Sequence, residues 1–304
     1  MIIAVTTHRL RVLQRQRVVA AVGATLLVAT ALAGVLGWSS HQTIVRVYDE
    51  AARLLQSTGR PAPPNPFLLK PTLSALSNMV VYVPLVGALL ALVLGHVSLA
   101  DDESSGLGRL LFSRAVSRTQ FALGTVLSVA LVLLAVLAAS LAVSLVSLLL
   151  VNGALSADDL GRLVVFFGLA WLYLLVFGLV GMVTVLLTRS RALALLLAIG
   201  VWLVVTFAVP QLTSGLRPVQ SLNPVTEPVG TSQLFFEVTA RARPLSVVEQ
   251  FKTASAVVLD TAPTEPVGTT LVRVLPIAAL AGLLLLAVLR LVGSHDWSRS
   301  ASDE

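Results

Sequence analysis

Few residues of this 304-residue chain could do covalent or metal chemistry. The sequence has no cysteine, which excludes disulfides, thiolate nucleophiles, cysteine-bound zinc and iron–sulfur clusters. Neither of its two lysines, Lys70 and Lys252, follows a glycine, so the Gly-Lys-Ser/Thr loop that holds nucleotide phosphates is missing. No His-Glu-x-x-His or Gly-x-Ser-x-Gly motif occurs either. We therefore expect no catalytic residue, no metal ligand and no cofactor-binding residue, and the chain is not itself an enzyme.

The apolar stretches of the chain hold one titratable exception, His96. Up to Leu289 they contain no Asp, Glu, Lys or Arg, whereas proton- and ion-coupled carriers place such groups in their membrane helices. His96 lies near the end of its stretch, where a hydrogen-bonded helix residue is more typical than a transport path. The third stretch carries hydroxyl residues at spacings that let helices approach closely, namely Ser128, Ser140, Ser144 and Ser147. The pattern disfavours an ion-coupled carrier.

The elements that must position these residues are membrane helices. Apolar residues make up 56% of the chain and charged residues only 12%, about half the charge of a globular protein, and mean hydropathy is +0.91. A helix needs about 20 apolar residues to cross a bilayer. Six stretches qualify: 18–38, 79–100, 121–151, 163–187, 192–209 and 274–292. The fold class is therefore an all-α integral membrane protein with six transmembrane helices, the fifth of which we expect to stop at Pro210.

Arginines set the orientation of these spans. They concentrate in the segment 1–17, in the loop 101–120, in the short loop after residue 187 and around the end of the last span. These arginines are Arg9, Arg11, Arg15, Arg17, Arg109, Arg114, Arg118, Arg189, Arg191, Arg290 and Arg299. The positive-inside rule then places both termini in the cytoplasm, including the tail 293–304, and makes 39–78 and 210–273 exported segments. The first span is too long for the apolar core of a cleaved signal and is interpreted as an anchor.

Both exported segments contain a candidate amphipathic helix. Residues 41–59 place Ile44, Val47, Ala51, Leu54 and Leu55 on one side, and a proline-rich connector, 61–66, follows. In the second segment Ser246 and Glu249 form a capping box, after which Val247, Phe251, Ala254 and Val258 recur at helical spacing. We expect this second helix to pack against the membrane helices of its own chain; the surface of a partner is the alternative.

The cytoplasmic loop 101–120 carries the most informative pattern. Acidic residues at its front suit the start of a helix and arginines suit its end. Leu107, Leu110, Leu111 and Arg114 fall on helical spacing, and Ser117 with Gln120 forms another capping box that begins the third span. The pattern predicts a short helix along the membrane face. An ordinary interfacial helix and a docking element for a partner fit it equally well.

This loop resembles that of permeases in the type-2 ABC exporter superfamily, particularly the group that contains the nitrous-oxide-reductase maturation permease. The matching positions are Glu103, Gly106, Leu110, Leu111, Val116, Ser117, Arg118 and Gly124, while Ala115 and Thr125 stand where the group has proline and lysine. Six spans, a basic N-terminal elbow helix over 1–17 and an exported helical segment before the last span fit the same group. Asn223-Pro224 resembles the Asn-Pro often found in that exported segment.

The resemblance implies the permease subunit of an ABC transporter in a prokaryotic cell membrane. Two copies, or this chain and a related one, would assemble with separate ATPase subunits that bind ATP and drive export. The loop 101–120 would be the coupling helix, with Glu103, Gly106, Leu110, Leu111, Arg114, Ser117 and Arg118 as the ATPase-coupling residues. Asn223, Pro224, Glu249 and Phe251 are candidates for a gate or for contact with an exported partner. The implied partners are the ATPase, the second permease copy and the lipid membrane, with an exported protein as a further candidate and no nucleic acid.

Two other functions stay open at this point. In the first, the chain passes ATP-driven motion through 210–273 to an exported partner and assembles or remodels it without transport. In the second, it is a stand-alone membrane scaffold. An apolar bundle without charges suits a lipid or another hydrophobic substrate better than an ion.

Overall fold

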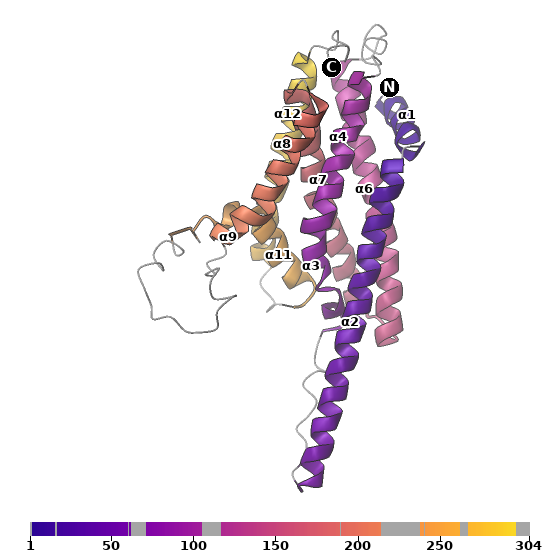
Figure 1. Ribbon diagram of the computed structural model, residues 1–304, viewed down its shortest axis with the longest axis vertical. Coiled ribbons are helices and arrows are strands. Elements are labelled where there is room, and N and C mark those ends of the chain that lie inside the picture. Colours follow the sequence, from indigo (N-terminus) through magenta and orange to yellow (C-terminus); the bar gives the residue numbers. More distant parts are fainter. Residues whose placement is uncertain are drawn as a thin grey trace.

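The computed structural model describes residues 2–15, 17–59, 61, 71–104, 117–188, 190–213, 238–239, 241–261 and 267–295. Every regular element within these ranges is a helix, and six helical stretches are long and apolar enough to cross a membrane. The predicted all-α membrane fold with six spans is thereby confirmed. Figure 1 shows the long helices running side by side, with α1 and the carboxyl end of α12 at the same end of the bundle.

The helices follow in a simple order along the chain. A short helix, α1 (Ile2–Arg15), precedes the first span, α2 (Arg17–Ser57). The second span consists of α3 (Met79–Tyr82), a π-helical turn η2 (Val83–Gly87) and α4 (Ala88–Ser104). The third and fourth are α6 (Arg118–Asn152) and α7 (Ala157–Leu187), and the fifth joins α8 (Arg191–Leu203), the π turn η3 (Val204–Ala208) and α9 (Val209–Thr213). The sixth is α12 (Val267–Ser294), and the shorter elements are η1 (Thr72–Leu76), η5 (Arg243–Leu245) and α11 (Val247–Val258).

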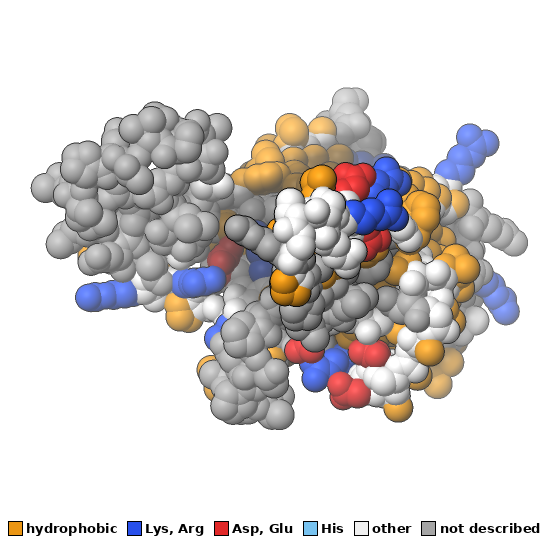
Figure 2. All heavy atoms as spheres, turned by 90° about the horizontal axis from the view of Figure 1, so that it is seen from below, with side chains coloured by type: hydrophobic (Ala, Val, Ile, Leu, Met, Phe, Trp, Pro, Cys, Tyr) orange, Lys and Arg blue, Asp and Glu red, His pale blue; other side chains and the backbone are white. Residues whose placement is uncertain are grey.

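The first span and the first amphipathic segment form one continuous helix. Its 41 residues extend about 60 Å, roughly twice the thickness of the hydrocarbon core. No glycine or proline separates Trp38 from the polar part of α2, so nothing ends the helix where the apolar stretch ends. Figure 1 shows α2 projecting beyond the other helices, and Figure 2 looks onto that end, where acidic and basic side chains lie close together. Exposed charges on the projecting part are Arg46, Asp49, Glu50 and Arg53.

Two spans contain a π-helical turn at or beside a proline. Pro84 lies within η2, and Pro210 follows η3. The N–H after each turn bonds five residues back, from Ala88 to the Val83 carbonyl and from Val209 to the Val204 carbonyl. The wider turn accommodates a residue that lacks an N–H and would clash with the carbonyl four residues before it. We predicted that the fifth helix stops at Pro210, and this prediction is wrong: the helix continues through Pro210 to Thr213.

The closest helix contact joins α4 to α7. An ideal Cβ built at Gly95 would lie 1.9 Å from the carbonyl oxygen of Gly178, and one at Gly181 would lie 2.2 Å from that of Leu92. Both distances are too short for any side chain, so the two backbones touch directly. Within a membrane such close packing drives helix association, because lipid already satisfies apolar surface.

The hydroxyl residues of α6 also serve packing. Ser128, Ser140 and Ser144 are fully buried, and a Cβ at Gly34 of α2 would lie 2.6 Å from the Ser147 Oγ atom. The contact of Ser147 with α2 and the burial of the other three serines agree with their interpretation as helix-packing residues.

The α4–α7 contact gives a stability prediction. We expect Gly181→Ala to lower the free energy of unfolding by about 1–3 kcal/mol, because its methyl group would press on the Leu92 carbonyl. Thermal unfolding of the purified protein in detergent measures the change. Gly168→Ala is the matched control on the same helix, because a Cβ there meets nothing within 4 Å. Equal loss of stability in both variants would contradict the close contact.

Candidate functional site at the arginine-rich end of the bundle

The loop with the informative pattern joins α4 to α6. Glu103 belongs to the last turn of α4, and Ser117 and Arg118 stand at the beginning of α6. The other predicted coupling residues, Gly106, Leu110, Leu111 and Arg114, lie outside the described residues. The structure therefore shows how the two ends of the loop are held.

The exit of the loop is fixed by a capping box. The Gln120 N–H donates to the Ser117 Oγ at 3.2 Å, and the Ser117 N–H donates to the Gln120 Oε1 at 3.4 Å. Such a cap stabilises a helix by about 1 kcal/mol. It also fixes the residue at which α6 begins, as the sequence pattern predicts.

Arg118 fastens that exit to the last span. Its Nη1 donates to the carbonyl oxygen of Gly293, in the last turn of α12. Carbonyls at the end of a helix have no partner within the helix and carry partial negative charge, so they attract a guanidinium. The contact joins the beginning of α6 to the end of α12.

The entrance to the loop is held by α1. The Arg9 Nη1 donates to the Ser98 carbonyl of α4 at 2.7 Å, and its guanidinium carbon lies 4.7 Å from the centre of the Phe121 ring of α6. Arg9 is only 8% exposed, and a cation–π contact of this kind contributes about 1–2 kcal/mol where water is excluded. A Cβ at Gly124 would lie 2.6 Å from the Val5 Cγ1 atom, so α1 lies close against α6. Arg9 thus bridges the two helices that flank the loop.

A third arginine reaches the same helix end from the fifth span. Arg191 is the first residue of α8, after Ser190, whose side chain caps that helix. The Arg191 Nη2 donates to the carbonyl oxygen of Ala100 in α4. We call Arg9, Arg118 and Arg191 the arginine collar, because each joins its own helix to the carboxyl-terminal part of another.

The sequence revealed only part of this collar. Arg118 was predicted as a site residue from its position in the motif, whereas Arg9 and Arg191 were used only to orient the spans. Their partners are backbone carbonyls, which every residue has, so no pattern of residue types marks the contact. Residues of this type near a helix end are a general signal for such contacts, but they do not identify which helix is contacted.

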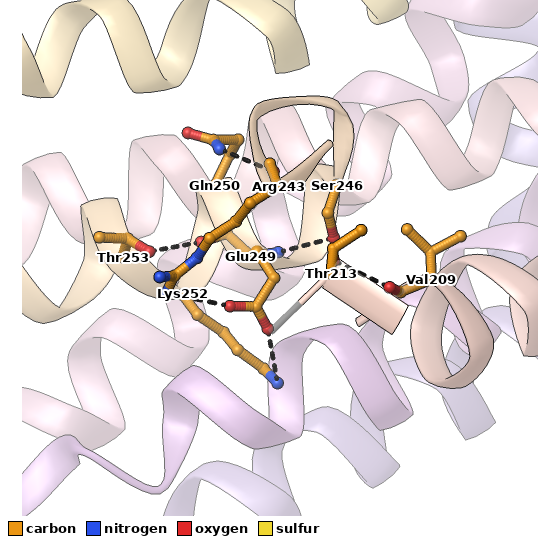
Figure 3. A network of polar contacts seen from close by, with 8 residues as sticks. All are labelled: Val209, Thr213, Arg243, Ser246, Glu249, Gln250, Lys252 and Thr253. Carbon is orange, nitrogen blue, oxygen red and sulfur yellow. Dashed lines mark hydrogen bonds and ion pairs between the residues drawn. The ribbon is translucent and has the colours of Figure 1, made fainter. Parts of the chain in front are cut away.

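At the opposite end of the bundle, α11 carries a compact charge cluster. The Glu249 carboxylate lies 3.3 Å from an Arg243 nitrogen and 3.8 Å from the Lys252 Nζ atom, and Figure 3 shows these side chains converging on it. Glu249 is 8% exposed, and its N–H donates to the Ser246 Oγ at 3.3 Å. Gln250 adds a bond from its side-chain amide to the Arg243 carbonyl. The cluster fixes the start of α11.

The aromatic residue of α11 inserts into the bundle. Phe251 is fully buried, with ring centres 4.6 Å from Tyr173 and 6.3 Å from Phe166 of α7. The helix packs against α7 and α12 of its own chain. This is the arrangement that we expected; the alternative was contact with the surface of a partner. Asn223 and Pro224 lie outside the described residues, so the structure describes only Glu249 and Phe251 of the four predicted gate residues, both of them on α11.

An ion pair links this helix to the beginning of α7. Arg162 lies 2.7 Å from Asp158 and 3.5 Å from Asp260, which follows α11. Asp159 and Ser156 form the capping box of α7. Within the residues that the structure describes, no three His, Cys, Asp or Glu side chains gather as a metal site would require.

The fold and these contacts define an all-α membrane protein in which the loop between α4 and α6 is held at both ends. The model of the ABC-2 family transporter proteins matches residues 3–293, nearly the whole chain. The chain belongs to this family and is a permease component of an ABC transporter. No curated protein matches it.

The position of Phe251 gives a second prediction. Phe251→Ala is expected to destabilise the protein by about 3–5 kcal/mol, because it leaves a cavity beside Tyr173. Thermal unfolding and the rate of proteolysis within 241–261 measure the loss. Leu245→Ala, which removes a side chain that is 80% exposed just before α11, should change neither quantity. A Phe251→Ala protein as stable as the parent would show that α11 does not depend on this contact.

Proposed function

We propose that this permease couples ATP hydrolysis by a separate ATPase subunit to the export of a substrate across the membrane. The observation that carries the proposal is the fastening of the loop between α4 and α6 at both ends. Arg9 and Arg191 hold its entrance, and Ser117 with Arg118 holds its exit. A docking element joined rigidly to its flanking helices can convert a push from outside the membrane into a movement of those helices.

The source of energy is consistent with the composition of the spans. Apart from His96, the predicted apolar stretches carry no side chain that is charged near neutral pH before Arg290, because they contain no Asp, Glu, Lys or Arg. A chain with little to titrate inside the membrane has no evident means to couple transport to protons or ions. ATP bound by a partner supplies the energy in this proposal, and the chain itself binds no cofactor.

The remaining parts of the proposal concern orientation and assembly. The arginine-rich end faces the cytoplasm of a prokaryotic cell, in accordance with the positive-inside rule. A second copy or a related chain completes the permease. Spans without Asp, Glu, Lys or Arg before Arg290 suit a lipid or another hydrophobic substrate better than an ion.

Isolation of the complex tests this proposal directly. We expect the tagged chain, purified from its native membrane, to retain a soluble protein with the Gly-x-x-x-x-Gly-Lys-Ser/Thr motif and to show ATP hydrolysis. Arg118→Ala should leave the complex intact and reduce hydrolysis about two- to tenfold, because the loop then loses its link to α12.

Arg290→Ala is the control, because Arg290 is an exposed arginine in the last turns of α12, the helix that Arg118 contacts. A solitary chain, under detergent conditions that preserve other ABC complexes, would refute the ATPase partnership. Unchanged hydrolysis in the Arg118→Ala complex would refute the coupling role of Arg118.

One observation favours the second function, in which motion is passed to an exported protein. The projecting part of α2 exposes Val47 by 60% and Leu54 by 69%, on the side that also carries Ile44 and Ala51. An apolar side of a helix in water suits a protein partner. A photo-crosslinking residue at Leu54 should then capture an exported protein in native membranes, with Gln56 as the control position. Capture together with no lipid movement by the reconstituted complex would favour this function over export.

A further inference from the structure

The arginine collar does more than satisfy the positive-inside rule. Arg9 is almost completely buried, whereas Arg11 on the same helix is exposed, although both count equally for membrane orientation. Orientation requires only charge on the correct side of the membrane. Burial of a guanidinium with its donors directed to a backbone carbonyl indicates a structural task in addition.

Two members of the collar hold one helix end from different sides. Arg9 donates to the Ser98 carbonyl and Arg191 to the Ala100 carbonyl, both within the last two turns of α4. Residues two apart on an α-helix are rotated by about 200° around its axis. The two guanidinium groups therefore approach nearly opposite sides of α4, directly before the loop.

The apolar packing of α8 makes its polar contact with α4 important. Within α8 the fully buried residues are the small Ala194 and Ala198, while the larger Leu195 and Trp202 are packed against the core only in part. Such a face interlocks weakly with its neighbours, so it resists sliding less than a face of large side chains. Polar contacts to the second span are Arg191 at the base of α8 and the Trp202 Nε1, which donates to the Pro84 carbonyl of η2 at 3.3 Å.

We propose that Arg9 and Arg191 are positioning residues that clamp the end of α4 and divide its movement between two routes. Arg191, with Trp202, makes the fifth span follow the second. Arg9 makes α1 and the beginning of α6 follow it. The proposal rests on the function proposed above, since it is the ATPase that moves the loop.

The absence of cysteine from the chain allows a test with introduced thiols. Gln211→Cys places one on an exposed position of α9, at the far end of the fifth span. In a second protein, Leu150→Cys places one near the far end of α6, where the side chain is 81% exposed. The purified permease–ATPase complex is treated with a fluorescent maleimide, with and without ATP and vanadate. At each site, the nucleotide response is the ratio of the modification rate with ATP and vanadate to the modification rate without them.

We expect Arg191→Gln to reduce the response at position 211 about twofold or more and to leave that at position 150 unchanged. Arg191→Gln combined with Trp202→Phe should abolish the response at position 211. Arg9→Gln should have the reverse selectivity, and Arg11→Gln, the matched control on α1, should leave both responses intact. If Arg191→Gln does not assemble, Arg191→Lys serves in its place, because it keeps the charge but not the planar donors.

The outcomes separate this inference from the proposed function. A parent complex whose thiols show no nucleotide response overturns both. If the parent complex responds to nucleotide and the response at position 211 persists in the variant with both Arg191→Gln and Trp202→Phe, the clamp is overturned. The proposed coupling to the ATPase is unaffected by that result. Equal losses at both positions in either arginine variant also overturn the clamp, because they indicate general loosening of the bundle and not two routes.

Discussion

The structure depends on the direct contact between the backbones of α4 and α7. Gly95 of α4 meets Gly178 of α7, and Gly181 of α7 meets Leu92 of α4. Neither Gly95 nor Gly181 has room for a Cβ atom. Because water is absent around the helices of a membrane protein, close packing must supply the association that the hydrophobic effect supplies elsewhere. The contact gives the bundle a rigid central pair, and the position of the end of α4 follows from it. The loop, the collar and the fifth span are all placed relative to that end.

The three arginines of the collar meet two physical requirements with the same groups. Their charge keeps one end of the bundle on the cytoplasmic side in the proposed orientation. Their planar donors bind carbonyls near the ends of helices, where the helix dipole favours positive charge. Lysine would meet the first requirement but could not present several donors in one plane. The near absence of lysine from the sequence, which has only Lys70 and Lys252, is consistent with both requirements acting together.

The features that the sequence made predictable are those that depend on local pattern. Six apolar stretches indicated the six spans, and the capping patterns at Ser117 and Ser246 indicated where α6 and α11 begin. At Ser246 only the N-cap half of the predicted box forms, because the Glu249 carboxylate pairs with Arg243 and Lys252. The end of the fifth helix was missed, because a π turn before Pro210 is not distinguishable from a helix stop by residue type. The contacts of the arginine collar were missed for a related reason: their acceptors are backbone carbonyls, which every residue type has. Phe251 was found by its helical spacing, but its partner Tyr173 lies 78 positions away in the sequence and belongs to another span.

Rigidity is distributed unevenly over the bundle, and the uneven distribution bears on mechanism. Many residues of α7 are themselves buried, including the large side chains of Tyr173 and Phe177, so this helix is held by its neighbours. In contrast, α8 fully buries only two alanines, packs Leu195 and Trp202 partly against the core, and has polar contacts to the second span at Arg191 and Trp202. A helix whose large side chains are only partly buried can shift along its neighbours with smaller cavities than a fully buried helix would leave. The proposed push on the loop would therefore move the central pair as a unit, and the end of α4 would pass the movement to the fifth span through Arg191 and to α1 and α6 through Arg9.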